Sequence, residues 1–291
     1  MNRAKESHNS ASRGSVRMVT SSGAKQSSRR YSRIVLRELV RTDFKMRYQG
    51  SFLGVAWSVL KPLMLFCVMY AVFVRFLKFT DGTPHFAMVL LLGTVLWSFF
   101  NEATNMGMVA VVGRGDLLRK VHFPTYIVVV AATLNSMISL LINLVVVIIF
   151  SIVNGVHFTW RVLLVPVGIV ELYLIALGCS LLLATLNVYF HDIQHIWEVF
   201  LQAMFYGMPI IYPLQMAMNA SPFFGKLLLL NPVAQTIQDV RYWLIEQRTP
   251  TVWNTINTPW IQTIPLILAA CIFALGVYVF NRNSSKFAEI L

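Results

Sequence analysis

The charged segment GRGDLLRKVHFP, residues 113–124, lies between two long apolar runs in a chain where only 12% of the residues are charged. Its centre is a leucine pair that needs cover from water, and charges stand on both sides. This pattern suits a short helix that docks into a groove on another protein, with apolar anchors at the centre and charges on the rim. A surface helix that rests on the membrane fits the pattern equally well. The residues assigned to this contact are Arg114, Asp116, Leu117, Leu118, Arg119 and Lys120.

A second set of charges lies in YSRIVLRELVRTDFKMRY, residues 31–48, where four basic residues recur at a spacing of four: Arg33, Arg37, Arg41 and Lys45. We call them the basic stripe, because this spacing places them on one face of a helix while apolar residues occupy another. The pattern predicts a helix in the membrane interface with its cations at the level of the phosphates. It acts as an anchor for the following span, as a site for the anionic head group of a lipid-linked substrate, or as both.

The sequence lacks the common motifs of nucleotide-binding and hydrolytic enzymes. The sequence contains no GxxxxGK[ST], HExxH or GxSxG pattern, so it has none of these devices for binding a nucleoside triphosphate or for hydrolysis. His191 and His195 are four residues apart with Asp192 beside them, but no other ligand is near, and we predict no metal there. The cysteines lie in apolar runs without metal or redox spacing: Cys67, Cys179 and Cys271. We therefore expect neither a cofactor nor an enzymatic activity in this chain.

The elements that position these charged segments are those of a membrane protein. With 57% apolar residues and a mean hydropathy of +0.65, the chain has more apolar surface than one soluble core can bury. A transmembrane helix needs about 20 mostly apolar residues. Runs of that kind predict six spans, near 53–77, 86–108, 125–152, 162–188, 196–213 and 260–281.

Six spans place both termini on one side. Residues 1–52 hold twelve of the twenty-four Lys and Arg, and the predicted topology puts seventeen on the side of the termini against six on the other. This asymmetry predicts cytoplasmic termini. Because the charge is concentrated in one Ser-rich segment, residues 1–30 are expected to be a disordered basic tail on an anionic leaflet, and no nucleic acid is expected as a partner.

Two predicted spans contain unusual residues. Glu102 is the in-span charge expected to face protein or water, because a charge at the bilayer centre is costly. The fifth span contains Gly207, Pro209 and Pro213, so we expect it to kink or to re-enter the membrane. Residues 214–258 are too amphipathic for a plain loop, and the pair Asn231-Pro232 predicts the start of a helix.

Four segments together resemble the ABC-2 permeases that export polysaccharides such as O-antigen, teichoic acid and mycobacterial-type galactan. They are the basic helix that leads into MRYQGSFLGVAWSVLKPL, the linker LLRKVHFP, the link NVYFHDIQHI and the later NPVAQTIQDVRYWL. The resemblance covers residues 31–291 and the segments follow the family's order. One departure is His191, where the family has a basic residue, usually Arg, before Asp-Ile.

The resemblance implies an all-α integral membrane protein with six transmembrane helices, an N-terminal amphipathic interface helix at 31–48 and a permease domain at 49–291. Within that domain, residues 113–124 would be the coupling helix, 189–195 with His191 and Asp192 the second contact, and 214–245 the re-entrant outer gate helices. Two permease subunits would enclose the path, and separate ATPase subunits would bind the ATP and Mg. The substrate would be a polyprenyl-pyrophosphate-linked polysaccharide, held by the basic stripe and exported across the cytoplasmic membrane.

Aromatic rings suit the lining of a sugar path, because they stack on flat C–H faces and still allow sliding. Spans one and five offer Trp57, Phe66, Tyr70, Phe73, Phe205, Tyr206 and Tyr212. Ordinary lipid-facing aromatics are the alternative for each of them. Three other functions stay open: an ABC-2 permease for drugs or small lipids, an ion-coupled secondary carrier, and a membrane-bound glycosyl or acyl transferase, for which no catalytic acid-base pair is apparent.

Overall fold

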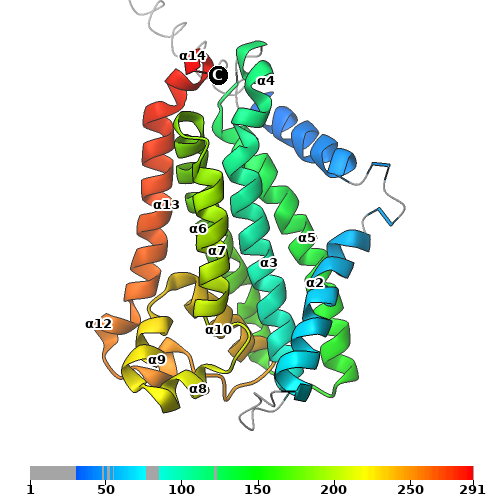
Figure 1. Ribbon diagram of the computed structural model, residues 1–291, viewed down its shortest axis with the longest axis vertical. Coiled ribbons are helices and arrows are strands. Elements are labelled where there is room, and N and C mark those ends of the chain that lie inside the picture. The colour runs from blue at the N-terminus through cyan, green and yellow to red at the C-terminus, as the bar shows by residue number, and fades with distance from the viewer. Residues whose placement is uncertain are drawn as a thin grey trace, which may run out of the picture.

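The computed structural model describes residues 31–47, 49–50, 53–54, 56–76, 85–120 and 123–290 (Figure 1). Every regular element within these ranges is a helix, which confirms the all-α prediction. The basic tail predicted for residues 1–30 lies outside the described residues. The amphipathic helix predicted for 31–48 is present as a helix over residues 31–47.

Five helices in the described part of the chain are long and apolar enough to cross a membrane. The first is α2 (Ala56–Met69), which continues as the π-helix η1 (Tyr70–Phe76). The others are α3 (Phe86–Ala110), α5 (Tyr126–Val153), α6 (Val165–Tyr189), which follows the 3-10 turn η3 (Trp160–Leu164), and α13 (Ile264–Asn283) with the 3-10 turn η4 (Ser284–Lys286). These correspond to five of the six predicted spans.

Helix α3 is the centre of the bundle. In its most apolar window 78% of the residues are buried, against 6% for the window of α2 and η1. It contacts α2, α5, α6, α7 and α10. Neighbouring helices approach closely at small residues: the Ser180 hydroxyl on α6 donates to the Ala103 carbonyl of α3 over 3.1 Å. A Cβ on Gly276 of α13 would lie 2.3 Å from the Gly178 carbonyl oxygen of α6, so this contact requires glycine.

The fifth predicted span, 196–213, is not one continuous helix. Helix α7 (Ile193–Gly207) has 15 residues, which is about 22 Å of helix against a hydrocarbon core of about 30 Å. The chain then leaves the helical conformation over residues 208–213, so the break predicted from Gly207, Pro209 and Pro213 is confirmed. Six full spans are therefore not confirmed, because α7 is too short to cross alone.

Five short helices follow this break and gather at one end of the bundle, the lower end in Figure 1. They are α8 (Leu214–Ala220), α9 (Pro222–Leu229), α10 (Pro232–Leu244), α11 (Val252–Thr255) and α12 (Pro259–Gln262). Helix α10 begins where the Asn-Pro pair predicts, since the Asn231 side chain accepts from the amides of Val233 and Ala234. We call this the short-helix end.

The opposite end holds the link between α3 and α5, the link between α6 and α7, and both ends of the described chain. The segment after α3 forms the 3-10 turn η2 (Val112–Arg114) and helix α4 (Gly115–Lys120), and residues 190–192 join α6 to α7. The C-terminal helix α14 (Phe287–Ile290) contacts both α4 and α6. The helix over residues 31–47 also reaches this end (Figure 1). We call it the link end.

Candidate functional site at the link end

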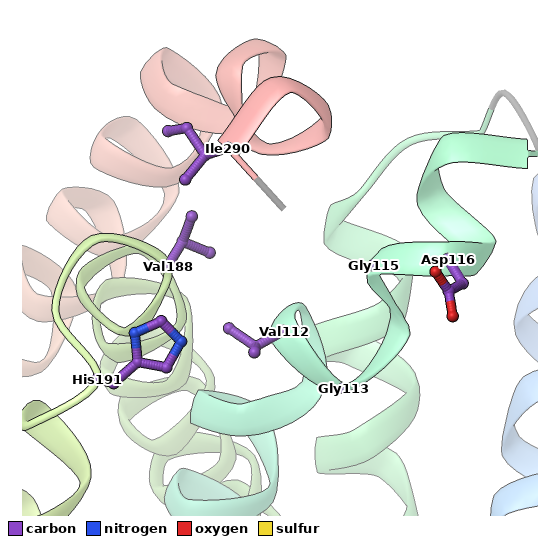
Figure 2. A pocket seen from close by; sticks show the side chains of 7 residues that line it. All are labelled: Val112, Gly113, Gly115, Asp116, Val188, His191 and Ile290. Atoms are coloured by element: carbon purple, nitrogen blue, oxygen red, sulfur yellow. The ribbon is translucent and has the colours of Figure 1, made fainter.

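The two predicted cytoplasmic contacts meet at one cavity. Its volume is about 390 Å³ and its lining comes from three parts of the chain: Val112, Gly113, Gly115, Asp116, Val188, His191 and Ile290. Figure 2 shows the side chains of Val112, Val188 and His191 turned toward one another, with Ile290 of α14 beyond Val188. The link after α3 and the link after α6 therefore form a single surface, to which the C-terminal helix contributes.

The predicted coupling residues differ in exposure. Four side chains are exposed to solvent: Asp116, Arg119, His191 and Asp192. Leu117 and Leu118 are half-buried. Leu118 packs against the apolar cluster that contains Val111 and Phe287 and against a second one that contains Ala110 and Val128. The chain itself thus supplies part of the cover for Leu118, whereas the sequence analysis looked for that cover in another protein or in the membrane. The side chain of Lys120 lies outside the described part of the structure.

Arg114 is paired inside the chain. Its Nη2 forms an ion pair with Oδ1 of Asp43, on the helix over residues 31–47. The same helix places Arg47 Nη1 2.5 Å from Glu102 Oε1 on α3. Glu102 therefore faces protein, as expected, but its partner is a basic residue that the sequence analysis had not singled out. The two pairs tie the N-terminal helix to the link end.

The basic stripe faces away from these contacts. Arg33, Arg37, Arg41 and Lys45 are all exposed. In the described part of the chain, none of the four forms an ion pair with a carboxylate. Four exposed cations along one helix face, none paired with a carboxylate of the described residues, are a suitable surface for phosphate oxygens, which accept strong charge-assisted hydrogen bonds.

The predicted path aromatics are divided between two sides of α3. Phe66 and Phe205 are buried in the main apolar core, and Tyr70, Phe73 and Tyr212 are half-buried against it. Trp57 and Tyr206 are exposed. Because α2 lies on one side of α3 and α7 on the other (Figure 1), the described residues of one chain do not enclose a passage between spans one and five.

A residue that the sequence analysis missed organises the short-helix end. Arg241 of α10 is 2% exposed, and its guanidinium donates to three backbone carbonyls: Val89 over 3.0 Å, Pro209 over 2.6 Å and Ile210 over 2.8 Å. Its fourth bond goes to Oε1 of Gln238, at 2.9 Å. Burial lowers the pKa of Arg241 to about 9. This value is still above neutral pH, so the side chain stays charged there. It satisfies the carbonyls freed where α7 ends, and joins that break to the start of α3.

Helix α10 also buries a carboxylate, Asp239, two residues before this arginine. Oδ2 of Asp239 accepts from Nε2 of Gln235 at 2.6 Å and from Nε1 of Trp253 at 3.1 Å, which fixes α11 against α10. Its Oδ1 has no partner in the described structure. Burial is the main cause that raises the pKa of Asp239 to about 7, and the charge of nearby Glu171 raises it further. Among the described residues, no group of three or more His, Cys, Asp or Glu is placed to hold a metal ion.

Comparison with known proteins agrees with this architecture. The family model for the ABC-2 type transporter matches residues 35–245. The chain is 28% identical over 242 residues to the O-antigen export system permease protein RfbA of Myxococcus xanthus, which covers 82% of this chain and 91% of that protein. It is 24% identical over 253 residues to a protein of the same name from Klebsiella pneumoniae, with 86% and 92% covered. The chain belongs to the ABC-2 type transporter family.

Proposed function

We propose that this protein is the transmembrane subunit of an ABC transporter that exports a lipid-linked polysaccharide across the cytoplasmic membrane. The observation that carries this proposal is the match to two O-antigen export permeases over more than four-fifths of both chains. The absence of a phosphate-binding loop from the sequence agrees with it, because a separate subunit would then bind ATP and Mg and hydrolyse the nucleotide. The polysaccharide would be a galactan, an O-antigen or a related polymer.

The link end would face the cytoplasm and bind the ATPase. Its exposed polar side chains, Asp116, Arg119, His191 and Asp192, are available to a partner, and two of them, Asp116 and His191, line the cavity formed by both links. Since η2 and α4 directly continue α3, a push on this end would move the central helix of the bundle. The excess of basic residues on the same side supports this orientation, with both termini in the cytoplasm.

The path would form between two copies of the chain. Helices α2 and α7 lie on opposite sides of α3, and each presents an uncovered apolar face, including Met64 and Val68 on α2 and Val199 on α7. A second subunit related by two-fold symmetry would bring α2 of one copy against α7 of the other. The passage would then be lined by those aromatics of spans one and five that are not buried in the core, and the short-helix end would close it outside.

The basic stripe would receive the pyrophosphate of the polyprenyl carrier. The exposure of all four cations and their freedom from carboxylate partners in the described structure support this role. The diphosphate head group carries several negative oxygens at the depth where an interface helix lies, so it would meet the cations without crossing the hydrocarbon.

Reconstitution tests the proposal. Vesicles would contain the permease with its ATPase subunit and a polyprenyl-pyrophosphate-linked oligosaccharide, and a glycosidase on one side would report arrival of the glycan. We expect transport only with both subunits and ATP. Transport by the lone chain under an ion gradient would instead identify a secondary carrier. Competition by small lipids or drugs at concentrations that abolish glycan transport would identify the alternative ABC-2 substrate class.

A further inference from the structure

The N-terminal helix carries a second stripe that the sequence analysis did not recognise. Leu39, Asp43 and Arg47 also recur at a spacing of four, but they are offset by two residues from the basic stripe. Two residues correspond to about 200° around an α-helix, so the two stripes lie on opposite faces. We call Leu39, Asp43 and Arg47 the anchor stripe.

Each member of the anchor stripe contacts a different part of the link end. Leu39 packs against the apolar cluster of Ala110, Val128 and Ala132, which also receives Leu118 of α4. Asp43 forms the ion pair with Arg114 of η2, and its other carboxylate oxygen lies 3.5 Å from Nδ2 of Asn135 on α5. Arg47 pairs with Glu102 of α3. The anchor stripe therefore spans the helices on both sides of the coupling segment.

This arrangement determines where the basic stripe points. Because Asp43 and Arg47 bind the bundle, the opposite face with Arg37, Arg41 and Lys45 is held outward at a fixed rotation. An anchor that simply lay on lipid would place its apolar side in the membrane and leave its rotation to the bilayer. Here the rotation is set by protein contacts, and one of them ends on Arg114, the second residue of the coupling segment.

We propose that Asp43 and Arg47 are positioning residues that join head-group binding on the basic stripe to the coupling segment. The inference rests on the proposed function and assigns to it a regulatory route: a pyrophosphate lipid on the basic stripe shifts the N-terminal helix, and the Asp43–Arg114 pair passes the shift to η2 and α4. The ATPase therefore hydrolyses ATP faster when the lipid-linked substrate is in place.

The chemistry of Arg114 makes it suited to this role. One guanidinium nitrogen, Nη2, pairs with Asp43, while Nη1 is buried and has no partner in the described structure. A buried guanidinium nitrogen without an acceptor is unfavourable, so Arg114 depends on Asp43 for its position. The side chains of this pair are 20% and 17% exposed, which leaves the interaction in partial contact with water. A pair of this kind is weak enough to shift during a transport cycle.

The test measures ATP hydrolysis by the permease–ATPase complex in phosphatidylethanolamine vesicles that contain increasing amounts of undecaprenyl pyrophosphate. We expect the wild-type complex to be stimulated. In Asp43→Asn, basal hydrolysis and assembly should be unchanged, while the lipid concentration for half-maximal stimulation rises about fivefold, the equivalent of one partly exposed ion pair. Exchange of the charges, Asp43→Arg with Arg114→Asp, should restore stimulation.

Glu38→Gln is the matched control, because it removes a carboxylate from the same helix at an exposed position. Unchanged stimulation of Asp43→Asn, or a loss of assembly and basal hydrolysis instead, would overturn the inference. Equal stimulation by phosphatidylglycerol or by inorganic pyrophosphate would also overturn it, since the stripe would then respond to surface charge or to a free anion. If the wild-type complex transports glycan but the lipid does not stimulate its ATP hydrolysis, only this inference is refuted. If the complex shows neither glycan transport nor stimulated hydrolysis, the proposed function is refuted as well.

Discussion

Arg241 offers the sharpest test of how the short-helix end is held together. Arg241→Met keeps an apolar stem but removes the guanidinium and with it every donor. The carbonyls of Pro209 and Ile210 and Oε1 of Gln238 would lose their bonds to the guanidinium in a site that is 2% exposed. Each buried acceptor left without a partner costs about 1–3 kcal/mol, so we expect a loss of at least about 3 kcal/mol in the free energy of unfolding.

Thermal unfolding in detergent, followed by tryptophan fluorescence, would measure this loss. In a protein of this size 1 kcal/mol corresponds to roughly 2 °C, so the Tm of Arg241→Met should fall by about 6 °C or more. Lys would not rescue the variant, because a single ammonium does not reproduce the planar fork that reaches three carbonyls. Gly93→Ala should act in the same direction, since its Cβ would lie 1.9 Å from Nη2 of Arg241.

The matched control is Arg248→Met, which removes the same charge from an exposed position nearby. Its Tm should stay close to that of the wild type. A cysteine placed at Ile210 would report the local effect, because loss of the arginine should open residues 208–213 to maleimide before the bundle unfolds. An unchanged Tm together with an unlabelled cysteine in Arg241→Met would refute the role assigned to this residue.

Three further outcomes follow from the structure. Because the pKa of Asp239 is raised to about 7 from about 3.9 when unfolded, the folded state binds more protons between these values, so the Tm should fall as pH rises from 5 to 8, and Asp239→Asn should remove this dependence. Met64→Cys on one copy and Tyr206→Cys on the other, with the native cysteines replaced, should cross-link between subunits; a purely intramolecular product would contradict the proposed dimer. Leu118→Asp should lower the folding yield because it places a charge between two apolar clusters, whereas Arg119→Glu should keep the Tm and weaken ATPase copurification; the reverse pattern would show that Leu118 faces the partner.

The sequence by itself determined the features that depend on local chemistry. Long apolar runs predicted five helices that the structure contains, since hydropathy over about 20 residues decides whether a segment enters lipid. Asn231-Pro232 predicted the start of α10, because cap and proline act within one turn. Gly207, Pro209 and Pro213 predicted the break after α7 for the same reason. The four-residue spacing of the basic stripe predicted the helix over residues 31–47.

Only the tertiary structure decided how distant residues are paired. The sequence analysis gave no role to Arg241, yet it binds a carbonyl 152 residues away, at Val89. The sequence signal for its burial was a basic residue within the apolar periodicity of α10. That pattern does not predict which carbonyls accept its hydrogen bonds. Leu118 likewise finds cover from α5 and from the C-terminal Phe287, which a leucine pair in a charged linker does not reveal.

The same limit applies to the N-terminal helix. Its basic stripe was readable because all four residues share one charge, whereas the anchor stripe mixes an apolar, an acidic and a basic residue and is recognisable only beside Arg114 and Glu102. Helix periodicity predicts which residues share a face, but only the tertiary structure determines which residues that face contacts. Electrostatic and packing partners are brought together by the crossing of helices, so their identity is a property of the whole bundle.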